Sequence, residues 1–294
     1  MEIETTNLVK TFRGGVRALD GVTLHIPSGM FGLLGVRGAG KTTFLRILAG
    51  IIRPSAGRVL IDGHDIASAA TRVGMRRTLG YVPQQLSGYP KLSVREFLDY
   101  VGLLKGIDHP SERRNQVAEL LNLVGLVHVA DHKLRQLTAG LQRKVAVAQA
   151  LLGDPRLVFV DEPARDLAAD DKAAVRRLLA RLAADRTVVV ATDDIDDITE
   201  ARASVGVLHH GRVAFSGPVA DLADVAKNRV WTVATAGTAP RVGAIVSAVD
   251  TGPAVCYRIV SAERPLGGAP AEPTAHDGYT ALISLPGLAM SPSA

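Results

Sequence analysis

Short apolar runs alternate with amphipathic segments through the first two thirds of the chain. Five runs have the length and composition of strands, and they cover residues 32–35, 79–82, 157–160, 187–191 and 205–208. Three of the five are continuously apolar, as expected for strands that helices cover on both faces. The pattern therefore predicts an α/β fold whose sheet is parallel at least in its centre.

Helical periodicity interrupts this alternation at about residues 89–140. Ser93 followed by Glu96 has the pattern of a capping box that opens a helix, and Ser111 precedes a second amphipathic segment. We therefore predict a helical insert within an α/β domain that spans residues 1–217.

The pattern changes again beyond residue 217. Alternating apolar and polar positions at 229–234 and 254–260 are typical of half-buried strands, and the stretch PTAHDGYTALI has the character of a closing helix. We predict that residues 218–294 form a small β-rich accessory region.

Composition narrows the classes of function. The net charge of +5 comes from 34 basic and 29 acidic residues without a block of like charges, so we expect no nucleic-acid partner. One cysteine, Cys256, excludes an internal disulfide and a cysteine zinc cluster and favours a reducing compartment. The first residues lack a secretory pattern and no run reaches about 18 apolar residues, so we expect a cytoplasmic chain.

The clearest chemical motif lies in FGLLGVRGAGKTTFLRIL, where a strand-like run meets an amphipathic helix. Gly35, Gly40, Lys41 and Thr42 have the spacing G-x-x-x-x-G-K-[ST] of a phosphate-binding loop. Backbone N–H groups of such a loop converge on phosphates, the lysine reaches the β and γ phosphates, and the hydroxyl can hold magnesium. The loop residues expected to contact a nucleotide are Gly35, Arg37, Gly38, Ala39, Gly40, Lys41, Thr42 and Thr43.

Two carboxylates follow another apolar strand in RLVFVDEP. Asp161 at the strand end can hold magnesium through water, and Glu162 can orient and deprotonate a water for attack on the γ-phosphate. Glu162 is therefore the candidate catalytic base.

Four segments together resemble the ATP-binding subunits of ABC transporters: GVRGAGKTT, YVPQQ at 81–85, LTAGLQRK at 137–144 and LVFVDEP at 157–163. The resemblance covers residues 1–217, and the run MFGLLG and the C-terminal region make it most similar to bacterial ABC-2-type exporters. It implies a P-loop NTPase of ABC type with a mixed sheet, which dimerises head to tail around two ATP molecules with Mg²⁺. It also implies a membrane-spanning permease subunit as partner, which would hold the chain peripherally on the inner face of the plasma membrane.

The resemblance assigns further roles by position. Phe12 takes the place of the aromatic residue that stacks on adenine, although it can also be a hydrophobic anchor near the N-terminal strands. Gln84 matches the glutamine that joins the metal site to the helical insert, so the implied metal residues are Thr42, Gln84 and Asp161. The signature segment that closes over the partner's γ-phosphate corresponds to Leu137, Thr138, Ala139 and Gly140.

Several positions depart from the family pattern. In the signature, Thr138 keeps a hydroxyl, but Ala139 replaces a glycine and adds a methyl group near a phosphate. Past the DEP triplet, Asp166 stands where glycine is usual and Ala168 where an aspartate is expected. Arg37 replaces asparagine or serine in the phosphate loop; it either adds a positive charge toward phosphate or is solvated.

The largest departure is Asp193, which occupies the position of the family's switch histidine. An ionised carboxylate cannot donate a hydrogen bond, and 4 Å from a phosphate charge it would repel by up to roughly 4 kcal/mol at a dielectric near 20. Loss of one positioned donor costs on the order of 10²–10³ in rate, so we expect slow hydrolysis unless Asp193 is protonated, turned away or paired with Arg37. We expect Asp194, Asp196 and Asp197 to begin a helix.

The sequence thus favours an ATP-binding subunit of an ABC transporter, with ATPase activity that Asp193 weakens. One alternative is a hydrolysis-impaired nucleotide sensor that regulates a transporter. A second is an ABC protein of translation or DNA repair, which the single nucleotide domain and the lack of a long coiled-coil insertion make less similar.

Overall fold

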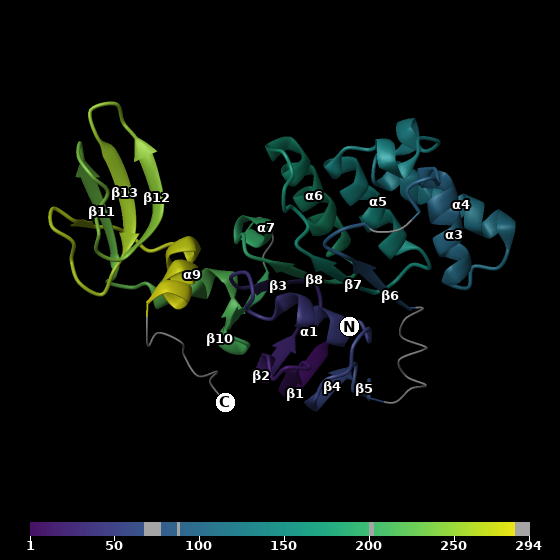
Figure 1. Ribbon diagram of the computed structural model, residues 1–294, viewed down its shortest axis with the longest axis horizontal. Helices are drawn as coiled ribbons and strands as arrows, with labels where there is room; N and C mark the ends of the chain where they lie inside the picture. Colours follow the sequence, from purple (N-terminus) through teal and green to yellow (C-terminus); the bar gives the residue numbers. More distant parts are fainter. Residues whose placement is uncertain (68–77, 87–88, 200–202, 286–294) are drawn as a thin grey trace.

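The computed structural model describes residues 1–67, 78–86, 89–199 and 203–285, and within them the strands form three sheets (Figure 1). The central sheet has the order β10-β9-β3-β8-β7-β6, parallel from β9 to β6 and antiparallel at β10. Its strands are β3 (Met30–Leu34), β6 (Leu79–Val82), β7 (Leu157–Asp161), β8 (Thr187–Thr192), β9 (Ser204–His209) and β10 (Arg212–Pro218). All five predicted strands and the parallel centre are confirmed.

A second, antiparallel sheet near the N-terminus has the order β2-β1-β4-β5. Its strands are β1 (Ile3–Thr11), β2 (Arg17–Ile26), β4 (Ala56–Ile61) and β5 (His64–Asp65). These strands are not among those the sequence predicted, because polar residues on their solvent face break the apolar runs. Helix α1 (Lys41–Leu48) lies between this sheet and the central one, and Phe44 and Leu45 are buried in the core that joins them.

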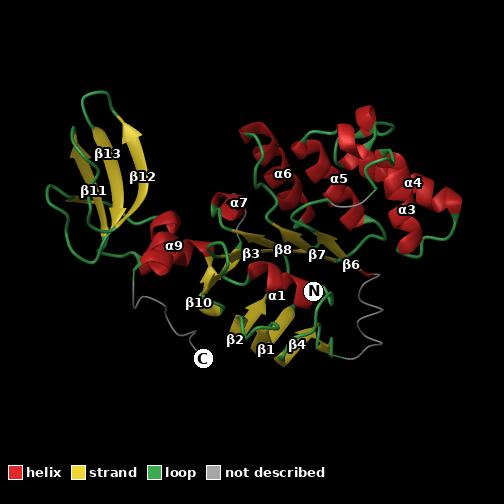
Figure 2. Cartoon of the chain, in the orientation of Figure 1, coloured by secondary structure: helices red, strands yellow, loops and turns green. Residues whose placement is uncertain are grey.

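The helical insert follows β6 and covers one end of the central sheet (Figure 2). It contains α3 (Val94–Leu104) and α4 (Pro110–Leu123), with short turns at Val127–Val129 and Leu134–Gln136 before α5 (Ala139–Leu151). The predicted capping box is confirmed, since Ser93 Oγ accepts from Glu96 N at 3.2 Å and Glu96 Oε2 accepts from Ser93 N at 2.7 Å. The helix predicted to follow Ser111, α4, begins two residues earlier than expected, at Pro110, whose fixed φ suits a first turn.

The C-terminal region forms the third sheet, of order β12-β13-β11-β14. Its elements are a short turn at Val219–Asp221, α8 (Leu222–Val225), β11 (Val230–Thr235), β12 (Ala244–Asp250), β13 (Val255–Val260), β14 (Ala269–Pro270) and α9 (Ala275–Ser284). Arg258 on β13 and the fully buried Asp277 on α9 form an ion pair at 2.6 Å that fixes the helix to its sheet. Residues 286–294 of the predicted accessory region lie outside the described part.

Helix α9 also connects this region to the central domain. It packs on α8 and reaches β9, and a Cβ at Gly278 would collide with the carbonyl of Leu222. Glycine permits this close approach between two helices of the accessory region, and the contact of α9 with β9 places that region beside the central sheet. Within the described ranges, no helix has the length and apolar character needed to span a membrane.

Candidate functional site

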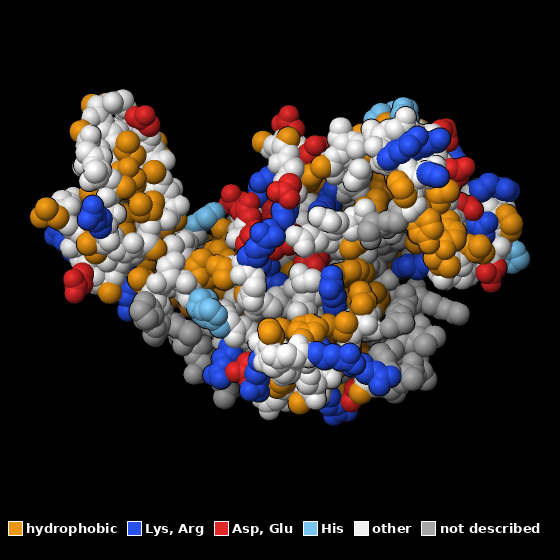
Figure 3. Space-filling view, in the orientation of Figure 1, with side chains coloured by type: hydrophobic (Ala, Val, Ile, Leu, Met, Phe, Trp, Pro, Cys, Tyr) orange, Lys and Arg blue, Asp and Glu red, His pale blue; other side chains and the backbone are white. Residues whose placement is uncertain are grey.

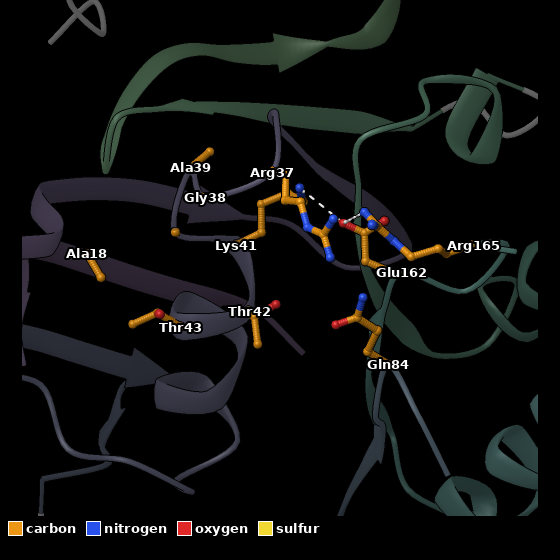
Figure 4. Close-up of a pocket in the computed structure, with 11 residues that line it drawn as sticks. Ala18, Arg37, Gly38, Ala39, Lys41, Thr42, Thr43, Gln84, Glu162 and Arg165 are labelled. Atoms are coloured by element: carbon orange, nitrogen blue, oxygen red, sulfur yellow. Dashed lines mark ion pairs between the residues drawn. The ribbon is translucent and has the colours of Figure 1, made fainter.

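The phosphate loop lies between β3 and α1, as the motif predicted. Gly40 precedes the helix with φ 107°, and a Cβ there would come 2.5 Å from the carbonyl of Ala18, so only glycine fits. The loop forms one wall of a cavity of about 280 Å³ (Figure 4). The residues that line this cavity are Ala18, Arg37, Gly38, Ala39, Gly40, Lys41, Thr42, Thr43, Gln84, Glu162 and Arg165.

Lys41 is held in place within this cavity. Its side chain is 5% exposed, and Nζ donates to the Gly35 carbonyl at 2.6 Å and lies 3.1 Å from Glu162 Oε1. Arg37 is exposed to solvent, yet it lines the same cavity, and Figure 4 shows its guanidinium directed into it. The loop therefore presents two positive charges to the cavity.

Oxygen donors suited to magnesium meet at the bottom of the cavity. Thr42 Oγ1 donates to Asp161 Oδ1 at 3.1 Å, and the amide of Gln84 is directed into the same space in Figure 4. Burial raises the pKa of the Asp161 carboxyl, so its ionised form would gain from a nearby cation. Hydroxyl, carboxylate and amide oxygens are the donors that Mg²⁺ prefers, and these three residues fit that ion.

Glu162 lies at the opposite wall in a constrained conformation. Its φ of 50° is left-handed, which is uncommon for a residue with a Cβ and frequent at functional sites. Its Oε1 accepts from Lys41 Nζ at 3.1 Å and from Arg165 at 3.2 Å. The carboxylate of the candidate base therefore forms ion pairs with two cations.

Asp193 does not line the cavity, and its carboxylate pairs with a residue that lies outside the four family segments. Its Oδ2 accepts from a terminal guanidinium nitrogen of Arg165 at 2.7 Å, so the pairing with Arg37 considered as a rescue is replaced by one with Arg165. Burial opposes the charge of Arg165, but Glu162 and Asp193 together raise its pKa. A chain of charges therefore runs from Lys41 through Glu162 and Arg165 to Asp193.

The other aspartates begin helix α7 (Asp196–Thr199), as predicted. Asp194 Oδ1 accepts from the backbone N–H of Asp196 at 3.0 Å, and both Asp194 and Asp197 pair with Arg176 of α6 (Ala169–Leu182) at 3.0 and 2.8 Å. Figure 3 shows acidic and basic side chains gathered over α7 and the adjoining part of α6. Two of these aspartates are therefore balanced by a single arginine of the neighbouring helix, Arg176.

The accessory region reaches this same end of the site. His276 Nε2 of α9 lies 2.9 Å from Asp196 Oδ1. The buried Tyr279 of α9 has a raised pKa, first because of burial and then because of the charges of Asp193 and Glu162. Residues of the C-terminal region therefore take part in the electrostatics around the candidate base.

The signature segment lies outside the phosphate cavity of its own chain. The Thr138 hydroxyl accepts a hydrogen bond from the N–H of Leu141 at 3.3 Å and so caps the N-terminus of α5. Ala139 lines a neighbouring hollow that shares Gln84 and Arg165 with the cavity. Leu137 is buried, and a Cβ at Gly140 would come 2.2 Å from the Asp171 carboxylate.

Two other departures have local structural consequences. Asp166 has φ 59°, in the left-handed region, which accounts for the glycine that the family usually has at this position. Aspartate tolerates this conformation better than most other residues. Ala168 precedes α6 without a side-chain cap, where an aspartate could have capped the helix. Phe12 lies past β1 with 42% of its surface exposed, and this exposure disfavours the hydrophobic-anchor interpretation. Its side chain does not line the phosphate cavity.

Comparison with known proteins supports this description. Residues 19–165 match the family model described as ABC transporter. The daunorubicin/doxorubicin resistance ATP-binding protein DrrA of Streptomyces peucetius is 34% identical over 222 residues, which cover 75% of this chain and 66% of that protein. The probable sulfate/thiosulfate import ATP-binding protein CysA of Chlorella vulgaris is 34% identical over 236 residues, covering 79% of this chain and 98% of that protein. The chain spans about two thirds of DrrA.

Solved structures show the same fold. The dimeric bacterial ABC transporter cassette MJ0796 superposes with a TM-score of 0.68 at 30% identity, covering 74% of this chain and 98% of the cassette. A post-hydrolysis form of that cassette, bound to ADP and Pi, gives 0.67 at 29% identity. The phosphate loop, the carboxylates at the end of β7 and these similarities agree: the chain belongs to the ABC transporter family.

Proposed function

We propose that this chain is the ATP-binding subunit of an ABC exporter, peripheral on the inner face of the membrane through a separate permease subunit and paired with a second nucleotide-binding subunit. The relatives include both a drug-resistance and an import ATP-binding protein, so they do not decide the direction of transport. The proposed export direction rests instead on the run MFGLLG and on the accessory region at 218–294. The observation that carries the proposal is the convergence of Lys41, Thr42 and Glu162 on one cavity.

Each residue has a role that follows from its position. Loop N–H groups and Lys41 bind the phosphates. Phe12 is 42% exposed and would stack on adenine, with Lys10 Nζ 5.2 Å from the centroid of its ring. Thr42, Gln84 and Asp161 would hold Mg²⁺, which neutralises charge on the phosphates. The signature residues 137–140, outside the cavity of their own chain, would act on the nucleotide of a partner subunit.

Hydrolysis is proposed to be slow for two reasons. Asp193 offers an acceptor where a donor is needed, and Glu162 is engaged by Lys41 and Arg165. Both cations contact the same carboxylate oxygen, which is one of the two acceptor oxygens that an attacking water would need.

The experiment compares ATP affinity and steady-state turnover for the wild type and for Asp193→His. We expect ATP still to bind, because the phosphate loop is unchanged, and the rate to rise about tenfold or more with the histidine. A wild-type rate on the order of 1 s⁻¹ or more without a partner would refute slow hydrolysis. Co-purification with a membrane subunit, followed by an ATPase assay of the complex, tests the transporter assignment.

A second candidate, a nucleotide sensor that regulates a transporter by ATP-dependent dimerisation, is favoured by the double engagement of Glu162. It differs from the first in one outcome: turnover of the complex with its permease stays as low as that of the isolated chain. An ABC protein of translation or DNA repair would instead fail to co-purify with any membrane subunit.

A further inference from the structure

Arg165 is a third cation at the nucleotide cavity, and no family motif accounts for it. One terminal nitrogen of its guanidinium lies 2.7 Å from Asp193 Oδ2 and 3.2 Å from Glu162 Oε1. The residue lines the same cavity as Lys41, from the wall that carries the candidate base (Figure 4). Arg165 therefore lies at the end of the cavity to which Lys41 points.

The hydrogen bonds of Arg165 are incomplete. Its Nε is fully buried and has no hydrogen-bond partner within the described residues, although a guanidinium presents five donors. A buried donor without an acceptor is costly, so the site favours a ligand that brings additional acceptor oxygens. Guanidinium groups match the oxygens of phosphates particularly well.

Asp193 holds this arginine from outside the cavity. The Asp193 side chain is 43% exposed and does not line the cavity, whereas that of Arg165 is 20% exposed and does. Asp193 and Glu162 contact the same terminal nitrogen of Arg165, Asp193 from outside the cavity lining and Glu162 from within it, so the guanidinium stays at the cavity next to the Glu162 carboxylate that Lys41 also contacts. The aspartate in the switch position thereby presents a cation to the ligand instead of a carboxylate.

We propose that Arg165, held by Asp193, contacts the γ-phosphate of ATP bound to its own chain and makes the site prefer ATP over ADP. The inference rests on the proposed ATP binding and extends it to a residue that determines specificity. A diphosphate would be held by the loop and Lys41 alone. The third phosphate adds negative charge near Glu162, and Arg165 compensates for it.

The test measures the ratio of Mg·ATP to Mg·ADP affinity by calorimetry on the full chain. Arg165→Met keeps the length of the side chain and removes the charge, and it is expected to weaken Mg·ATP binding about 10- to 100-fold, the value of one charge-assisted hydrogen bond. Mg·ADP affinity is expected to change less than about twofold. Arg165→Lys keeps the positive charge near Asp193 but lacks the planar guanidinium with its several donors. It should give a ratio of Mg·ATP to Mg·ADP affinity between those of the wild type and Arg165→Met.

Arg176→Met is the matched control. Arg176 also pairs with aspartates after β8, Asp194 and Asp197, and it is similarly buried, but it does not line the cavity. It should leave the affinity ratio unchanged even where it lowers the melting temperature. An unchanged ratio in Arg165→Met and Arg165→Lys, or an equal loss in Arg176→Met, would overturn the inference while leaving ATP binding intact. A wild type that binds neither nucleotide would instead overturn the proposed function together with the inference.

Discussion

The two walls of the nucleotide cavity differ in how far they follow the family pattern. On the phosphate-loop wall, Gly40, Lys41 and Thr42 stand where the motif requires them, and Thr42 contacts Asp161 directly. On the opposite wall, Arg165 connects Glu162 to Asp193, which lies outside the cavity lining at the position where the resemblance implies a histidine. The residues proposed to hold the nucleotide follow the family pattern, while those proposed to act on its last phosphate depart from it.

We propose that nucleotide binding and hydrolysis depend on separate groups, one on each wall. The phosphate loop is fixed by backbone geometry that only glycine allows, whereas the opposite wall depends on side-chain charges that can be exchanged in pairs. The negative charge of Asp193 is compensated by its ion pair with Arg165.

The largest expected effect is on the retained wall. Lys41→Met should weaken Mg·ATP affinity by about 10²-fold, because it removes a buried charged donor to phosphate, and binding titrations measure this loss. Lys227→Ala, a change at an exposed lysine of the accessory region, is the control and should have no effect. Equal affinities for Lys41→Met and the wild type would show that this wall does not bind the nucleotide.

Lys105 and Arg165 are both largely buried cations, but their pKa values shift in opposite directions. Lys105 Nζ donates to the Leu79 carbonyl at 2.8 Å, and burial lowers its pKa to about 8, whereas carboxylates raise the pKa of Arg165. Between pH 8 and 10.5 the unfolded chain binds the proton that the folded chain has lost, so stability should rise with pH across that window. Below pH 8 the charge costs a constant amount, on the order of 1–3 kcal/mol.

Lys105→Met should therefore raise stability at pH 7 and flatten its rise between pH 8 and 10, as denaturant titrations across that range can show. Mg·ATP affinity should not change, since Lys105 does not line the phosphate cavity. A wild-type stability that falls between pH 8 and 10 in step with that of the variant would contradict the assignment.

A smaller effect is expected at the rearranged wall. Glu162→Gln should abolish residual hydrolysis and tighten Mg·ATP binding by about tenfold, because it removes a negative charge near the γ-phosphate and releases Lys41 and Arg165. Asp166→Asn removes a charge from the same loop at an exposed left-handed position and should change affinity less than about twofold. Weaker ATP binding in Glu162→Gln would mean that the carboxylate assists binding.

The sequence predicted the features that depend on local pattern. The buried central strands and the phosphate loop are continuous motifs, so their positions follow from a few adjacent residues. The N-terminal sheet was missed because its strands have one polar face. Its β1 is mixed in polarity even at buried positions such as Thr5.

The rearranged wall could be predicted only in part. Asp193 is visible against the family pattern, but its pairing with Arg165 joins residues 28 positions apart and depends on how β8 and the loop after β7 lie in space. The contact of His276 with Asp196 spans 80 positions and needs the packing of α9, which no local pattern reveals. Both interactions are tertiary, so no local pattern in the sequence indicates them.

A single-turnover experiment with the isolated wild-type chain in excess over radiolabelled Mg·ATP tests the separation of binding from hydrolysis most directly. The bound nucleotide is recovered by filtration and separated into ATP and ADP over time. We expect most ATP to be bound yet to remain uncleaved for about ten seconds or longer, at a rate about 10²-fold or more below typical enzyme turnover. Conversion of bound ATP to ADP within a second would contradict it.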